Sequence, residues 1–135
     1  MYLLDTNIIS ELRKGKPRQS PNVRKWAKDI AAHQLYLSVI TIMKIEIGIL
    51  RMERKDTKQS TILRRWFEIV TQDFEGRILP FSAKTALLCA KTNVPNQRSF
   101  RDSMIAATAA EYNLALVTRN IADFEGLGIE LINPF

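Results

Sequence analysis

Short apolar segments alternate with amphipathic helical patterns along the chain, and this alternation limits the folds open to it. We predict strands at residues 2–5, 34–40, 77–81, 114–118 and 129–135. Apolar residues recur at helical spacing between them, which predicts helices at 6–14, 22–32, 41–54, 56–74, 82–92 and 99–113, with a short turn or helix at 120–126. Because strands that alternate with helices form a parallel sheet covered on both faces, the sequence predicts an α/β fold.

Length and composition predict one ordinary globular domain over residues 1–135. The chain is 46% hydrophobic and 25% charged, close to the average for globular proteins. No apolar run approaches the ~18 residues that a membrane span needs, and the N-terminal segment carries two acids where a signal peptide has a basic flank. We therefore expect a cytoplasmic protein with no membrane partner. Cys89 is the only cysteine, which excludes a disulfide framework and a cysteine metal site.

The charge balance favours a polyanionic partner. Twenty Lys and Arg residues against 14 Asp and Glu residues give a net charge of +6, and nucleic acid is the first partner class that such an excess suggests. Arg13, Lys14 and Lys16 flank a Gly- and Pro-containing loop after the first predicted helix. We predict that they contact the phosphates of a nucleic acid such as RNA, and a plain solvated surface remains the alternative.

Three aspartates follow a strand or begin a helix: Asp5, Asp102 and Asp123. Each is also explained as a helix cap or first-turn residue, because Asp accepts hydrogen bonds from free backbone N–H groups there. The carboxyl ends of parallel strands meet at one sheet edge, so the topology can gather all three. Clustered carboxylates without a His or Cys cluster favour Mg²⁺ or Mn²⁺ over Zn²⁺. An acidic site of this kind on a basic protein suggests phosphodiester hydrolysis.

Lys44 stands near the start of the helix predicted in "SVITIMKIEIGIL", residues 38–50. If Thr41 is the N-cap, residue 44 is the third helical position, where a positive charge opposes the helix dipole. The cost of an exposed lysine there is only about 0.3 to 1 kcal/mol, so a solvated surface residue remains possible on this ground alone.

Four segments together resemble the PIN-domain ribonucleases, and in particular the VapC toxins of bacterial VapBC toxin–antitoxin systems: "LLDTNIISEL", "LSVITIMKIEIGIL", "RDSMIAATA" and "LVTRNIADFEG". The resemblance implies a PIN-like three-layer α/β/α sandwich with a central parallel sheet, and Mg²⁺- or Mn²⁺-dependent endonuclease activity on RNA. It further implies a transfer RNA substrate, a VapB-type antitoxin whose C-terminal segment occupies the groove by the active site, and a homodimer within a larger toxin–antitoxin assembly.

The resemblance also implies roles for individual residues. Asp5 would be the first metal ligand, with Thr6 and Asn7 orienting it in the same turn. Asp102 would be the second principal acid, and Asp123 matches a more variable acid that acts through water. Supporting polar contacts would come from Thr118 and Asn120.

Position 44 departs from the VapC pattern, because the family usually has a glutamate of its acidic quartet there and this chain has lysine. Three explanations are open: a substitution introduced or selected to inactivate the enzyme, which we favour, natural degeneration of the lineage, or metal binding by the three aspartates alone. We expect impaired metal-dependent cleavage. The alternative function is an inactive PIN module that binds antitoxin or RNA. A phosphotransfer domain is disfavoured, because "DTN" lacks the second Asp of a "DxD" pattern.

Overall fold

The computed structural model describes residues 1–135 and contains one sheet of five parallel strands in the order β3–β2–β1–β4–β5. The strands are β1 Tyr2–Leu4, β2 Leu35–Ser38, β3 Ile78–Leu79, β4 Ala115–Val117 and β5 Leu131–Ile132. The predicted parallel sheet is confirmed. The first strand lies in the middle of the sheet, so the residues that follow it are flanked by strands on both sides.

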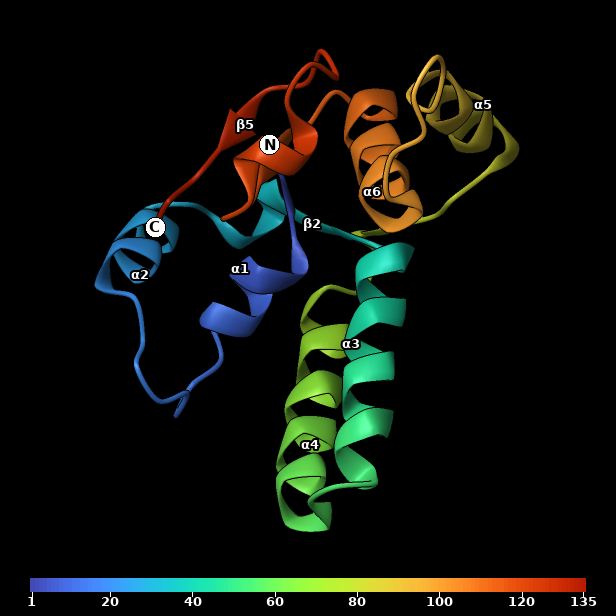
Figure 1. The fold of residues 1–135 in the computed structure, drawn as a ribbon. Coiled ribbons are helices and arrows are strands. Elements are labelled where there is room, and N and C mark those ends of the chain that lie inside the picture. The colour runs from blue at the N-terminus through green and yellow to red at the C-terminus, as the bar shows by residue number, and fades with distance from the viewer.

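Six α-helices and two short 3₁₀ helices connect the strands. Their bounds are α1 Thr6–Glu11, α2 Pro21–Lys28, η1 Ala32–Gln34, α3 Val39–Glu53, α4 Thr57–Asp73, α5 Ala83–Lys91, α6 Phe100–Glu111 and η2 Ile121–Phe124. Helices α3 and α4 form a long hairpin that projects away from the sheet, while α5 and α6 lie together at the opposite end of the molecule (Figure 1). None of the helices combines the length and apolar character that crossing a membrane requires.

Alternating side chains of the strands build two hydrophobic cores, one on each face of the sheet. Leu4 and Val117 pack into a core with residues of α1, α2, α3 and α4. Leu3 and Leu116 point the other way, into a core with α6 and η2. The predicted three-layer α/β/α arrangement is therefore confirmed.

Helix α3 begins two residues earlier than predicted, and this moves Lys44 relative to the helix start. Ser38 is the N-cap, and its hydroxyl accepts a hydrogen bond from the Thr41 backbone N–H at 3.1 Å. The prediction failed because Val39 and Ile40 are β-branched and were assigned to the strand. Thr41 is thus not the cap, and Lys44 lies in the second turn, where the helix dipole opposes it less.

Other elements are shorter than predicted. Helix α1 ends at Glu11 instead of residue 14, and α2 ends at Lys28 instead of residue 32. Strand β5 has two residues instead of seven, because it pairs with β4 only through Leu131 and Ile132 and has no partner on its other side. The motif-bearing turns keep their predicted places.

Glu11 ties the loop between α1 and α2 to the core. Its buried carboxylate forms an ion pair with Lys16 Nζ at 2.7 Å and accepts a hydrogen bond from the Ser20 backbone N–H at 2.6 Å. The contact with Lys16 is the main reason why the pKa of Glu11 lies below its usual value, against the opposing effect of burial. The ionised Glu11 carboxylate therefore holds both Lys16 and Ser20 of this loop against the end of α1.

We predict that Glu11→Gln lowers the free energy of unfolding at neutral pH by about 1 kcal/mol, because it removes the charge from this contact. A folded-state pKa below the unfolded value gives stability that is present above about pH 4.3 and is lost as the pH falls through the folded pKa. Urea unfolding at a series of pH values should therefore show the two proteins converging in acid. A difference that stays constant with pH would contradict the assignment.

Candidate active site

Asp5 is the central acid of the site and is held by three hydrogen bonds. It directly follows β1, caps α1 and is only 3% exposed. The Thr6 backbone N–H donates to Oδ1 at 2.7 Å, while Thr118 Oγ1 and Asn7 Nδ2 donate to Oδ2 at 2.8 and 3.3 Å. The Asp5 backbone N–H donates to the Val117 carbonyl at 2.9 Å. Side chain and backbone together fix this carboxylate between β1 and β4.

Asn7 and Thr118 also accept hydrogen bonds from the backbone of the segment that follows β4. Asn7 Oδ1 accepts a hydrogen bond from the Arg119 backbone N–H at 3.2 Å, and Thr118 Oγ1 accepts one from the Asn120 backbone N–H at 3.1 Å. Asn120 therefore contributes through its backbone, while its side chain is exposed. The Thr6 hydroxyl is buried without a hydrogen-bond partner.

Lys44 reaches Asp5 from the neighbouring helix α3. Its Nζ lies 3.8 Å from Asp5 Oδ1, and its side chain is 23% exposed. Two unit charges about 4 Å apart at an effective dielectric constant of about 20 attract one another by roughly 4 kcal/mol before desolvation is subtracted. This attraction opposes the dipole cost of a fraction of a kcal/mol for a lysine early in a helix. Lys44 is therefore part of the acidic site.

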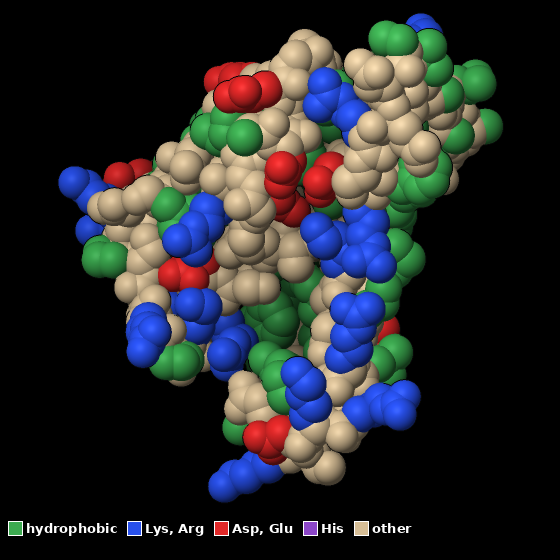
Figure 2. Space-filling view, viewed as in Figure 1, with side chains coloured by type: hydrophobic (Ala, Val, Ile, Leu, Met, Phe, Trp, Pro, Cys, Tyr) green, Lys and Arg blue, Asp and Glu red, His purple; other side chains and the backbone are tan.

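Asp102 and Asp123 complete the acidic group at this edge. Asp102 lies half-buried in the first turn of α6, and Asp123 is exposed in η2. Burial raises the pKa of Asp102 above its usual value; the Lys44 ammonium opposes this rise, and the charges of Asp123 and Asp5 add to it. The four groups thus interact electrostatically. Figure 2 shows acidic side chains gathered above α3, with basic side chains directly below them.

The side chains in this arrangement do not fit a bound Mg²⁺ or Mn²⁺ ion. No group of three or more His, Cys, Asp or Glu side chains is arranged to hold a metal. Both oxygens of Asp5 already accept hydrogen bonds, and Oδ1 also faces the Lys44 ammonium. Mg²⁺ requires near-octahedral oxygen ligands, and a neighbouring fixed cation repels it.

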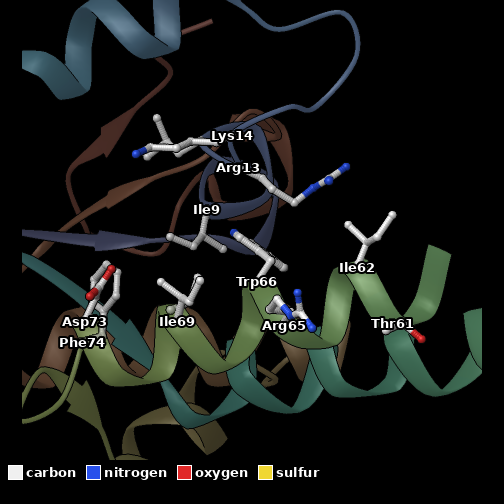
Figure 3. A pocket seen from close by; sticks show the side chains of 12 residues that line it. Ile9, Arg13, Lys14, Thr61, Ile62, Arg65, Trp66, Ile69, Asp73 and Phe74 are labelled. Atoms are coloured by element: carbon white, nitrogen blue, oxygen red, sulfur yellow. The ribbon is translucent and has the colours of Figure 1, made fainter. Parts of the chain in front are cut away.

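An apolar cleft lies away from the aspartates, between the end of α1 and one face of α4 (Figure 3). Its volume is about 640 Å³, and its apolar lining includes Ile9, Trp66 and Ile69. Two of the predicted RNA-binding residues, Arg13 and Lys14, line it. The third, Lys16, does not; it is paired with the buried Glu11.

Sequence reasoning missed the α4 side of this cleft. Arg65 lines it from α4, together with Ile62, Trp66 and Ile69. Ile62 and Ile69 are half-exposed, seven residues apart and on the same helical face. This second apolar stripe, outside the one that packs into the core, is the signal that would have revealed the cleft.

The sequence and the fold were compared with those of known proteins. The PIN domain family model matches residues 2–127. The chain belongs to the PIN-domain family. A VapC ribonuclease of Sinorhizobium fredii, Y4jK, is 33% identical over the whole chain and 98% of its own length. The FitAcB crystal structure from Neisseria gonorrhoeae has a TM-score of 0.88 at 30% identity, covering 99% of this chain and 98% of that one.

A toxin–antitoxin complex from Klebsiella pneumoniae shares the fold, with a TM-score of 0.70 at 24% identity and coverage of 100% and 98%. The family resemblance drawn from the four sequence segments is confirmed, and so is the PIN fold. In this PIN domain the turn after β1 carries Asp5, and α6 and η2 bring the other two aspartates toward it.

We predict that Thr118→Val destabilises the PIN domain by about 1 to 3 kcal/mol, because the buried Asp5 carboxylate loses its shortest side-chain hydrogen bond. Thermal unfolding followed by circular dichroism measures the loss. Thr71→Val is the matched control, since its hydroxyl bonds only to the Glu68 carbonyl on the surface of α4. Equal effects of the two substitutions would argue against a special role for Thr118.

Proposed function

We propose that this chain is the endoribonuclease toxin of a toxin–antitoxin pair, with residues 1–135 acting as one cytoplasmic PIN domain, and that Lys44 impairs its metal-dependent cleavage of RNA. The observation that carries the proposal is the 3.8 Å contact between Lys44 Nζ and Asp5 Oδ1 inside the acidic site. The ribonuclease name of a full-length relative supports the reaction class. Transfer RNA is the proposed substrate and Mg²⁺ or Mn²⁺ the proposed cofactor.

Lys44 acts on the site as a fixed positive charge. The negative charges of Asp5, Asp102 and Asp123 favour a cation in this region, and the Lys44 ammonium beside Asp5 supplies part of that positive charge from within the protein. A glutamate at the same position would provide a further oxygen donor instead of a positive charge. The substitution therefore both removes a ligand and adds a competitor.

We predict that Lys44→Glu increases cleavage of a small-RNA fraction, including transfer RNA, by roughly 10- to 100-fold or more in Mg²⁺ or Mn²⁺. Gel analysis of this chain beside the variant measures the change. Lys44→Glu combined with Asp5→Ala is the control and should be inactive. Cleavage of equal strength by this chain and by Lys44→Glu would mean that the aspartates suffice without position 44.

Metal binding gives a second measurement of the same change. In EDTA, Lys44→Glu should unfold at a lower temperature than this chain, because a fourth carboxylate replaces the counter-ion of Asp5. Mn²⁺ should restore its stability and leave that of the parent almost unchanged. Tight Mn²⁺ binding by the parent in calorimetry, unchanged by Lys44→Glu, would contradict the proposal.

The second candidate is an inactive PIN module that binds antitoxin or RNA without cleaving it, and the same lysine favours it. The two candidates differ in what the unmodified chain does. Cleavage by this chain that depends on metal and is abolished by Asp5→Ala would exclude the inactive module.

We further propose that the C-terminal segment of a VapB-type antitoxin binds in the α1–α4 cleft, which none of the three aspartates lines, and not in a groove directly beside the acidic site. An apolar cleft between two helices suits an amphipathic segment with apolar anchors. Arg13, Lys14 and Arg65 line it against a single acid, Asp73, which favours acidic residues in the bound segment.

Helix α3 carries a second apolar face that supports the proposed homodimer. Its core face includes Ile45 and Ile49, yet Val39, Met43 and Leu50 are 37%, 42% and 48% exposed on another side. A helix that is apolar on more than one side is usually buried on each of them. We propose that a second copy covers this face in solution.

We predict that Met43→Glu with Leu50→Glu converts the homodimer into a monomer, because two charges replace the apolar contacts. Sedimentation equilibrium measures the molar mass. Ile62→Glu with Ile69→Glu, which places the same charges in the cleft, is the control and should leave the dimer intact. If the unmodified protein is a monomer, the dimer proposal is wrong, and the cleavage proposal is unaffected.

A further inference from the structure

Lys44 stands at one end of a row of basic side chains. Arg51 follows it on α3 seven residues later, which is almost two helical turns and therefore the same side of the helix. Lys55 lies in the turn directly after the helix. Figure 2 shows Lys and Arg side chains descending from the acidic cluster over the α3–α4 hairpin.

The two residues of this row that follow Lys44, Arg51 and Lys55, form no ion pair. The four ion pairs of the structure involve Lys16, Lys44 and Arg64, and neither Arg51 nor Lys55 takes part in any of them. Arg64, by contrast, is held by Glu46 and Glu53 between the two helices of the hairpin. The two outer cations are exposed and available to an external anion.

The surface between Lys44 and Arg51 is open. Gly48 is exposed there, and a Cβ built on it would have no atom within 4 Å. The spacing of the basic residues and the open surface at Gly48 suit an extended chain of negative charges that lies against the helix. They do not form an enclosed pocket for a small anion.

We propose that Lys44, Arg51 and Lys55 form a track that binds the sugar–phosphate backbone of single-stranded RNA without a metal ion. The proposal rests on the proposed function for the identity of the polyanion. Neutralising phosphates with Lys and Arg releases counterions, so the binding depends steeply on salt. A glutamate at position 44 would interrupt the track at the end that meets Asp5. The lysine that impairs cleavage thus extends the binding surface into the acidic site.

The test is fluorescence anisotropy of a short fluorescein-labelled oligouridine in EDTA over a series of salt concentrations. Arg51→Glu with Lys55→Glu should weaken binding roughly tenfold and make the salt slope shallower by about two, one for each lost phosphate contact. Lys44→Glu should make it shallower by about one. Lys84→Glu with Lys91→Glu on α5 is the control with the same change of net charge, and it should bind almost as tightly as the parent.

Equal weakening by the Arg51/Lys55 and the Lys84/Lys91 variants would overturn the track, because net charge alone would then explain the binding. Absence of binding by the folded parent in EDTA would also overturn it. Neither result touches the proposed function, which is decided separately by RNA cleavage with Lys44→Glu in Mg²⁺ or Mn²⁺. Circular dichroism of each variant shows whether the fold is retained.

Discussion

The burial of the Asp5 carboxylate between two strand ends is the constraint on which the rest of the site depends. A buried carboxylate must be satisfied, and this one receives hydrogen bonds from its own turn and from Thr118 at the end of β4. The hydrogen bond from Thr118 joins residues that are 113 positions apart in sequence. Asp5 therefore has two roles. It is the acid that would serve the reaction, and it also links the end of β1 to the end of β4.

Lys44 contributes to the electrostatics of this site and not to the packing that builds the fold. The chain keeps the PIN fold, and the FitAcB structure matches 99% of it with a TM-score of 0.88. Lys44 enters from α3 and supplies the positive charge that the carboxylates attract. The fold itself is held by strand pairing and by two apolar cores, to which Lys44 does not belong.

The sequence was sufficient for the layers of the fold and for the elements that carry the three aspartates, but not for the surfaces. Strand and helix order follow from strong periodicity, and Asp5, Asp102 and Asp123 follow from their places at strand ends and helix starts. The start of α3 was missed because β-branched residues at a helix start look like a strand, while Ser38 caps it. The α1–α4 cleft and the pairing of Lys16 with Glu11 depend on contacts between distant segments, which local patterns do not contain.

Helix α3 shows why one pattern of hydrophobicity is insufficient to assign a helix its role. Ile45 and Ile49 face the core, Val39, Met43 and Leu50 face solvent, and the side of Lys44 and Arg51 is basic. Folding of the single chain requires only the first of these faces. Lys44 contributes to the folded chain through its contact with Asp5. The exposed apolar residues have no contact that would need them to be apolar in the monomer, and Arg51 forms no ion pair, so neither is explained by folding of the single chain. We explain the two faces by partners that cover them. An apolar surface would cover Val39, Met43 and Leu50, and a polyanion would cover the side of Lys44 and Arg51.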